Sequence, residues 1–429
     1  MLALGLSAGN ASAAATPQRW ALDKVVLVMR HGIRAGTGAT RIQAVSRKRW
    51  PAFEAAPGML TRHGGEAIAR LGAWQRDWLL HAGLLNGAAC PAAGMVFAWA
   101  SPLPRTRDTA RAFLDALLPN CATAFGHASS VADDGLFHPL ESRRVRLDPA
   151  RARAAVLAAM GGGLDTARQS GAGDVRAMEA LVGKPAACEN SPCGLSGLPW
   201  EVRTSAHKAD VAGPLRVGAV MGETIRMQYA DGWPLGEVAF GAVTKAADVK
   251  QWMALRAAKY AVLDTVPYLA QRGGSQLMSQ VLAAIDDDRA VGSPPADARL
   301  LIFVGHDGNI AQLRSLLGFD WQLSGYPEND PVPGGMLVFE RWRDTAENAR
   351  DRISVRVRYV AQSLDQLRGL TVLSGKAAPL SVTFLPAGAG PDGRLPRSRF
   401  DALISAAIDW SATFPASYAS PVATASRGE

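Results

Sequence analysis

Three short runs of consecutive apolar residues recur along the chain, and a loop with charged side chains follows each of them. They span 24–29, 95–99 and 300–304, and the second and third lead into apolar stretches that predict helices ending near 118 and 317. Continuous apolar runs connected through helices are typical of parallel strands that are buried on both faces. Because ligands of open α/β sheets bind beyond the carboxyl ends of the strands, we expect the three loops to line one crevice.

The pattern changes between about 130 and 260. Alanine-rich periodic stretches over 149–160 and 205–229 predict helices there. Two further apolar runs, 334–342 and 352–360, predict additional strands. We therefore expect an α/β fold, a three-layer sandwich around a mainly parallel sheet, with a core over 16–130 and 260–429 and a mainly helical cap domain over 131–259.

The loop after the first run carries the densest chemistry of the chain, Arg30-His31-Gly32-Ile33-Arg34. Guanidinium groups suit the planar, bidentate binding of phosphoryl oxygens, and a neutral imidazole can attack phosphorus. A solvated basic turn would explain this loop taken alone. Arg105 after the second run and the adjacent pair His306-Asp307 after the third weaken that alternative, because they add further candidate groups at the same sheet edge.

Net charge agrees with an anionic partner but does not identify one. The 429 residues include 46 basic and 38 acidic side chains, which gives +8 at pH 7. This balance favours a phosphorylated small molecule, nucleic acid or an anionic surface. No basic stretch interleaved with aromatic residues and no nucleic-acid-binding motif stands out, so we expect no nucleic-acid partner.

The N-terminus and the cysteines suggest export. Residues 1–15 are uncharged and rich in alanine, which fits a truncated signal peptide with a small-x-small cleavage site, although a disordered alanine-rich terminus is the alternative. No other stretch approaches the ~18 apolar residues needed to span a bilayer. The four cysteines allow three connectivities, and their two local groups lead us to hypothesise the bridges Cys90–Cys121 and Cys188–Cys193. We expect a periplasmic or secreted protein without a membrane partner.

Taken together, these motifs resemble the histidine acid phosphatase branch of the histidine phosphatase superfamily, near the bacterial phytases and glucose-1-phosphatases. The family pattern RHGxRxPT is similar to RHGIRAGT at 30–37, and HDxN is similar to HDGN at 306–309. Family-like segments continue through 60–72 and 332–343, so the resemblance spans about 24 to 415 in order. It also implies two local disulfides that match the two cysteine groups.

The resemblance implies a role for each matching residue. His31 would be the nucleophile that forms a phosphohistidine, and Asp307 would protonate the leaving alkoxide and then activate water. The groups that would bind the substrate phosphate are Arg30, Arg34, Arg105, His306 and Thr37. The family implies a metal-independent acid phosphomonoesterase without a cofactor, and we expect a monomer acting on a small phosphate ester.

Four departures from the family pattern bear on the substrate. Gly36 replaces a proline, Gly38 stands where close phytases carry a lysine, Gly308 replaces a threonine or serine, and Met336 stands where they have a glutamate. Each change removes a polar contact or a stiff residue, so tight recognition of inositol hexakisphosphate is doubtful. Four basic residues could compensate at the pocket rim or form a solvated face: Arg41, Arg47, Lys48 and Arg49.

Alternatives remain at this point. A second Arg-His-Gly begins at Arg62, and we interpret it as a helix start capped by Thr61, with a structural His63. The other histidines lack neighbouring arginine or aspartate motifs and are expected to be ordinary surface or core residues: His81, His127, His138 and His207. The competing functions are a phosphatase or mutase of the cytosolic branch and a non-catalytic polyanion-binding protein on the same fold.

Overall fold

The computed structural model describes residues 19–87, 89–188, 193–346 and 352–418. Its centre is an eight-stranded mixed sheet. Four strands pair in parallel in the order β1, β6, β2, β3. On its other side, β1 pairs antiparallel with β7, and β7 pairs antiparallel with β8. Strand β8 in turn pairs with both β9 and β10. The strands are β1 Trp20–Arg30, β2 Val96–Ala100, β3 Gly126–His127, β6 Leu300–Gly305, β7 Met336–Asp344, β8 Ile353–Ala361, β9 Leu380–Thr383 and β10 Leu395–Pro396.

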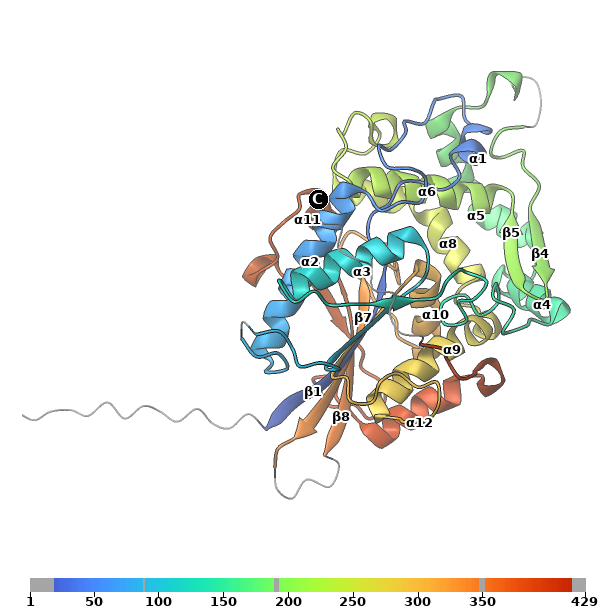
Figure 1. Ribbon diagram of the computed structural model, residues 1–429. Coiled ribbons are helices and arrows are strands. Elements are labelled where there is room, and N and C mark those ends of the chain that lie inside the picture. Colours follow the sequence, from blue (N-terminus) through green and yellow to red (C-terminus); the bar gives the residue numbers. More distant parts are fainter. Residues whose placement is uncertain (1–18, 88, 189–192, 347–351, 419–429) are drawn as a thin grey trace, which may run out of the picture.

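Alternation along β1 explains why helices cover both faces of this sheet. Val25 and Leu27 belong to an apolar cluster with α2 and α3, whereas Val26 and Val28 belong to a cluster that includes α9 and α10. Successive side chains of a strand point to opposite faces, so a wholly apolar strand needs cover on each side. The covering helices are α2 Arg62–His81, α3 Pro104–Leu117, α9 Pro267–Asp286, α10 Asp307–Leu317 and α12 Arg397–Ala407. The α/β three-layer sandwich is thereby confirmed (Figure 1).

A mainly helical region lies beyond the carboxyl ends of the parallel strands (Figure 1). It contains α4 Pro149–Ala159, α5 Leu164–Val182, the hairpin of β4 Glu201–Ser205 and β5 Lys208–Ala212, α6 Pro214–Ala230, α7 Ala246–Trp252 and α8 Ala254–Val262. The helix predicted over 205–229 is wrong in its first third. There the chain forms the β4–β5 hairpin, whose Val202 and Val211 are buried, and Pro214 occupies the first turn of α6. The division into domains at 131 and 259 stays a prediction.

Short elements complete the described chain: the helices α1 Ala39–Gln43 and α11 Leu364–Arg368 and the 3-10 turns η1 Ala186–Cys188, η2 Val238–Gly241, η3 Gly375–Ala377 and η4 Trp410–Ala412. Both hypothesised disulfides are present, Cys90–Cys121 and Cys188–Cys193. Among the described helices, none is long and apolar enough to cross a membrane. The predicted signal peptide lies outside the described residues.

Candidate active site

The backbone around His31 is fixed on both sides, because β1 ends between two other strands. The amide of His31 donates to Gly305 O at 3.0 Å, and the amide of Gly334 donates to His31 O at 3.0 Å. These hydrogen bonds join the end of β1 to the end of β6 and to the turn before β7. The loop that follows is therefore positioned by the sheet itself.

The second Arg-His-Gly supports this loop from outside. Thr61 caps α2, and its hydroxyl accepts from the amide of Gly64 at 2.8 Å, which confirms the predicted helix start. A Cβ atom at Gly64 would lie 2.3 Å from Ile33 O, so only glycine permits this approach. His63 points elsewhere, with Nε2 2.8 Å from Leu367 O.

The imidazole of His31 is buried and neutral. Its Nδ1 lies 2.9 Å from Gly32 O, and because a carbonyl only accepts, Nδ1 carries the proton and Nε2 keeps its lone pair. Burial lowers the pKa of His31 well below its usual range, and the guanidinium groups of Arg30, Arg105 and Arg34 lower it further. An unprotonated ring nitrogen among fixed cations is the state that a nucleophile for an anionic substrate needs.

Three arginines carry buried donors that the protein leaves unused. The Nε atoms of Arg30, Arg34 and Arg105 are buried and have no hydrogen-bond partner among the described residues. Unpartnered arginine Nε atoms also occur elsewhere among the described residues, as at Arg107 and Arg314, so it is the convergence of three guanidinium groups on one imidazole that suits this site to an anion. Burial lowers the pKa of Arg34 to about 10, which still leaves it charged at neutral and acidic pH.

His306 lies across from His31, with the two ring centroids 5.6 Å apart. It precedes α10, and its backbone amide donates to Asn309 Oδ1 at 2.9 Å. On one edge of the ring, Nε2 is 3.0 Å from Ser101 Oγ, and on the other, Nδ1 is 3.5 Å from Arg105 Nη2. The structure thus brings the three predicted loops together.

Asp307 follows as the first residue of α10 and is held by groups from a different region. Its Oδ2 accepts hydrogen bonds from Arg256 and, at 2.6 Å, from the hydroxyl of Tyr260, both on α8. Arg30 Nη2 lies 3.7 Å from the same oxygen. Burial alone would raise the pKa of Asp307, but the charges of Arg256 and Arg30 outweigh it and lower the pKa well below its usual range.

Buried charges continue behind Arg30. Glu223 of α6 accepts from both Arg30 and Arg226, and Arg226 donates to Asp330 Oδ2 at 2.5 Å. Burial would raise the pKa of Glu223, but Arg226 and Arg30 lower it, so Glu223 is a carboxylate. Arg30 also donates to the carbonyl of Pro331 at 2.5 Å. This network fixes the direction of the Arg30 side chain.

Sequence reasoning missed Glu223, Arg256 and Tyr260, which lie outside every motif. The one available signal was a Glu-x-x-Arg pair, Glu223 and Arg226, inside an otherwise largely apolar helix. His138, expected to be an ordinary surface or core histidine, lies next to His306. Its Nε2 lies 3.2 Å from His306 Nε2 and 3.2 Å from Ser101 Oγ, because the loop after β3 folds back over the sheet edge.

A pocket of about 380 Å³ opens beside Arg256. Of the predicted site residues only Thr37, which is exposed, lines it, so the pocket lies beside the buried arginines and His31 and does not contain them. The other charged residues that line it include both cations and carboxylates: Arg41, Glu141, Lys208, Asp210, Arg216, Lys259 and Asp264. His207, expected to be an ordinary residue, also lines it. Of the four proposed rim cations, Arg41 lies here, whereas Arg47 donates to Lys184 O, Lys48 lies over Phe240 and Arg49 lines another hollow.

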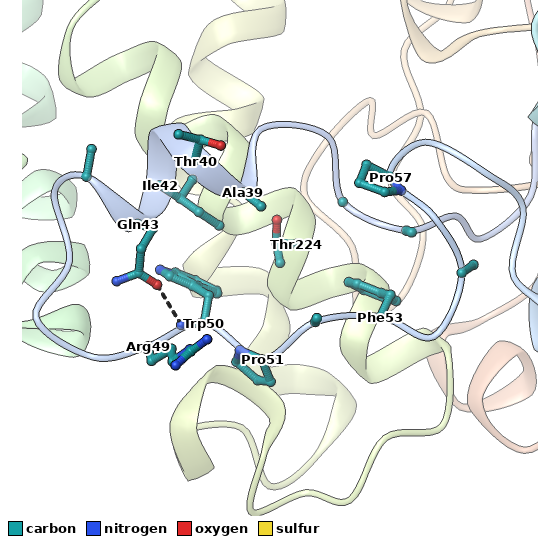
Figure 2. A pocket seen from close by; sticks show the side chains of 15 residues that line it. Ala39, Thr40, Ile42, Gln43, Arg49, Trp50, Pro51, Phe53, Pro57 and Thr224 are labelled. Carbon is teal, nitrogen blue, oxygen red and sulfur yellow. Dashed lines mark hydrogen bonds between the residues drawn. The ribbon is translucent and has the colours of Figure 1, made fainter.

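That other hollow, about 640 Å³, is lined mainly by residues of the segment 35–57. None of the predicted site residues line it. Figure 2 shows its mostly apolar walls, and in this view Thr224 lies between Trp50 and Phe53. A Cβ atom at Gly36 would lie 3.4 Å from Thr224 Oγ1, so this departure from the family pattern faces the apolar hollow. Gly38 has φ +119°, a conformation that disfavours lysine there.

The other two departures have local explanations. A Cβ atom at Gly308 would lie 3.1 Å from Asp264 Oδ1, so the missing side chain leaves room for that carboxylate. Met336 is fully buried in the apolar cluster under α2 and α3, where it packs with Met29. The expected loss of a polar contact at this position therefore concerns the core.

Comparison with known proteins places this geometry in one family. The profile of the histidine phosphatase superfamily (branch 2) matches residues 21–189 and 230–360. The phytase AppA of Escherichia coli (strain K12) is 34% identical over 383 residues, covering 86% of this chain and 87% of that protein. The glucose-1-phosphatase of Salmonella typhimurium is 30% identical over 408 residues, covering 91% and 94%.

Solved structures agree with the sequence relatives. The phytase of Klebsiella sp ASR1 superposes with a TM-score of 0.81 at 32% identity, covering 92% of this chain and 98% of its own. The Hafnia alvei phytase gives a TM-score of 0.85 at 29% identity, covering 94% and 100%. The chain therefore belongs to branch 2 of the histidine phosphatase superfamily.

Proposed function

We propose that the protein is an acid phosphomonoesterase that works through a phosphohistidine at His31 without a metal. The observation that carries this is the neutral imidazole of His31, with a free Nε2, among three arginines with unused buried donors. Such a site binds a phosphoryl group and presents a nucleophile to it. The family relatives named as a phytase and a glucose-1-phosphatase support the same reaction class.

In the first step, His31 Nε2 attacks phosphorus and forms a P–N bond while the P–O bond to the organic group breaks. Arg30, Arg34, Arg105 and His306 stabilise the charge on the transferring phosphoryl oxygens. Asp307 gives its proton to the leaving alkoxide, which is a poor leaving group without it. The products are an alcohol, a phosphohistidine and the carboxylate of Asp307.

In the second step, water attacks phosphorus and Asp307 accepts its proton. The P–N bond breaks, the electron pair returns to His31, and inorganic phosphate leaves. Asp307 is protonated again, so the cycle consumes only ester and water. Asp307 must be protonated when the cycle starts, and its pKa lies well below its usual range, so we expect activity that falls as the pH rises from the acidic side.

The charges around His31 support the proposal of metal independence. Burial is the largest cause of the lowered pKa of the His31 imidazole, and three guanidinium groups lower it further. The positive field of these groups would repel a divalent cation at the nucleophile. Within the described residues, no group of three or more His, Cys, Asp or Glu side chains could hold a metal ion. Activity in EDTA tests this point directly.

The test of the reaction uses the two Arg-His-Gly tripeptides as a matched pair. His31→Ala should lower hydrolysis of p-nitrophenyl phosphate at about pH 5 by about 10⁴-fold or more, as expected on loss of a covalent nucleophile. His63→Ala removes the histidine of the other tripeptide, outside the site, and should retain turnover. Wild-type rates in His31→Ala would remove His31 from the mechanism. In a second measurement, substrate labelled in its phosphate should transfer the label to the wild-type protein and not to His31→Ala.

We further propose a small organic phosphate as the substrate and export as the setting. The lining of the 380 Å³ pocket includes carboxylates as well as cations, which suits an ester with hydroxyl groups beside its phosphate. A panel of sugar phosphates and inositol hexakisphosphate, measured from about pH 3 to 8, decides between these classes. Two disulfides support the periplasm or the exterior, where such bonds persist.

A further inference from the structure

The two oxygens of Asp307 have different surroundings. Oδ2 accepts from Arg256 and from Tyr260 Oη at 2.6 Å, and Arg30 Nη2 approaches it to 3.7 Å. Oδ1 accepts from the backbone amide of Gly308 at 3.1 Å. One oxygen is thus surrounded by cationic and hydroxyl donors, and the other has one neutral donor. A proton on Asp307 therefore belongs on Oδ1, while Oδ2 keeps its donors.

Arg256 is itself held rigidly. Its Nε donates to Tyr260 Oη at 2.9 Å, and its guanidinium carbon lies 4.7 Å from the centre of the Tyr260 ring. Arg256 and Tyr260 are one turn apart on α8, so they present a joined pair to Asp307. Glu223 Oε2 lies 3.9 Å from Arg256 Nε, which adds an anchor from α6.

Asp307 is also near other charged or titratable groups. They come from β1 and its loop, from α3, from α6, from α8 and its C-terminal turn, and from the residue before α10: Arg30, His31, Arg34, Arg105, Glu223, Arg256, Tyr260, Asp264 and His306. Arg256 and Tyr260 differ from the arginines around His31 because they bind the carboxylate directly and belong to the helical region.

We propose that Arg256 is a positioning residue for the proposed phosphatase reaction: together with Tyr260 it holds one oxygen of Asp307 and sets the pH range over which Asp307 donates its proton. This inference rests on the function proposed above. It assigns to α8, far from every sequence motif, control over the acid that the leaving group needs.

The direction of the effect follows from the charge. A guanidinium in contact with a carboxyl favours its charged form, so Arg256 lowers the pKa of Asp307 and restricts the protonated acid to lower pH. Removing the charge raises that pKa. Turnover that depends on the acid then persists to higher pH, by about one pH unit, because Arg30 remains in place.

The experiment compares Arg256→Gln with wild-type protein on glycerol phosphate and on p-nitrophenyl phosphate. The ratio of the two kcat values is followed against pH, since only the alkyl ester needs full protonation of its leaving group. In Arg256→Gln, the pH at which this ratio falls should be higher than in the wild type by about one pH unit. Arg256→Lys keeps the charge and should stay near the wild-type position. Tyr260→Phe removes one hydrogen bond and should shift it less, in the same direction.

The matched control is Arg216→Gln, which removes another cation of the same pocket, one that pairs with Asp210 and not with Asp307. Superimposed ratio curves for Arg256→Gln and wild type, or an equal shift in Arg216→Gln, would overturn the inference and leave the phosphatase proposal intact. A wild-type protein that hydrolyses neither ester would overturn both. Should Arg256→Gln fail to fold by circular dichroism, the direction seen in Tyr260→Phe decides.

Discussion

Two regions build the candidate active site in different ways. The sheet edge contributes Arg30, His31 and His306, each next to a strand end whose backbone hydrogen bonds fix its place. The helical region contributes Glu223 and Arg256, whose long side chains reach the site from α6 and α8.

This difference separates two tasks. Short loops after parallel strands hold reacting groups within narrow limits, so they carry contiguous motifs. A helix that contributes a single side chain to the site needs a suitable residue at only one position, so its sequence contains no contiguous motif. We infer that the sheet edge specifies the reaction and the helical region specifies its conditions, above all the ionisation of Asp307 and the direction of Arg30.

The largest effect that tests the comparison is expected at the sheet edge. Asp307→Asn keeps the shape of the side chain but removes the acid, so kcat on glycerol phosphate should fall by about 10²–10⁴-fold. The loss on p-nitrophenyl phosphate should be much smaller, because its leaving group needs little protonation. Equal losses on both esters, measured at the pH optimum, would contradict the role of acid.

Removal of Glu223 tests whether the helical region supports the sheet edge. Glu223→Ala leaves Arg30 and Arg226 without their shared carboxylate and should cost about 3–5 kcal/mol of unfolding free energy, measured by urea denaturation. The matched control is Glu340→Ala on β7, a buried carboxylate paired with Arg356 and Arg358 away from the site. Similar destabilisation with lost activity only in Glu223→Ala supports the comparison, and full activity in both variants would break it.

Asp134, behind the site, gives a smaller effect on stability. Burial raises its pKa to about 7, so the folded protein keeps this proton more readily than the unfolded chain. The resulting stabilisation is complete below the unfolded pKa of about 3.9 and is lost as pH rises through about 7. Asp134→Asn keeps an oxygen that accepts from the amides of Leu136 and Phe137. Because asparagine does not titrate, this variant should not lose stability as the pH rises through about 7.

Thermal melts should therefore show the wild type losing about 3–4 kcal/mol relative to Asp134→Asn between about pH 4 and 7.5. A constant difference across that range would mean that Asp134 does not titrate there.

The smallest expected effect concerns His138, which contacts His306 from outside the motifs. His138→Phe removes one polar neighbour of His306 Nε2 but leaves Ser101 Oγ at 3.0 Å, so we expect about a tenfold loss of kcat with little change in stability. His127→Phe, on β3, is the control and should keep the wild-type rate. No loss in His138→Phe would assign the orientation of His306 to Ser101 alone.

Much of the sheet and its loops could be predicted from the sequence because their physical causes are local. The apolar runs at 24–29, 95–99 and 300–304 became the adjacent parallel strands β1, β2 and β6. The stretch 205–229 was harder, because alanine and serine are compatible with a helix and the hairpin is decided by burial of Val202 and Val211. His138 was missed for a similar reason, since its contact depends on how a loop without regular structure folds back.

The sequence by itself was enough to predict that the loops after three strands meet and that His31, Asp307 and the nearby basic residues lie in one site. These follow from short-range rules of strand, turn and residue chemistry. Only the tertiary structure decided that Glu223 orients Arg30 and that Arg256 and Tyr260 bind Asp307. Those contacts join residues 47 to 193 positions apart, and their energy depends on burial that no local pattern encodes.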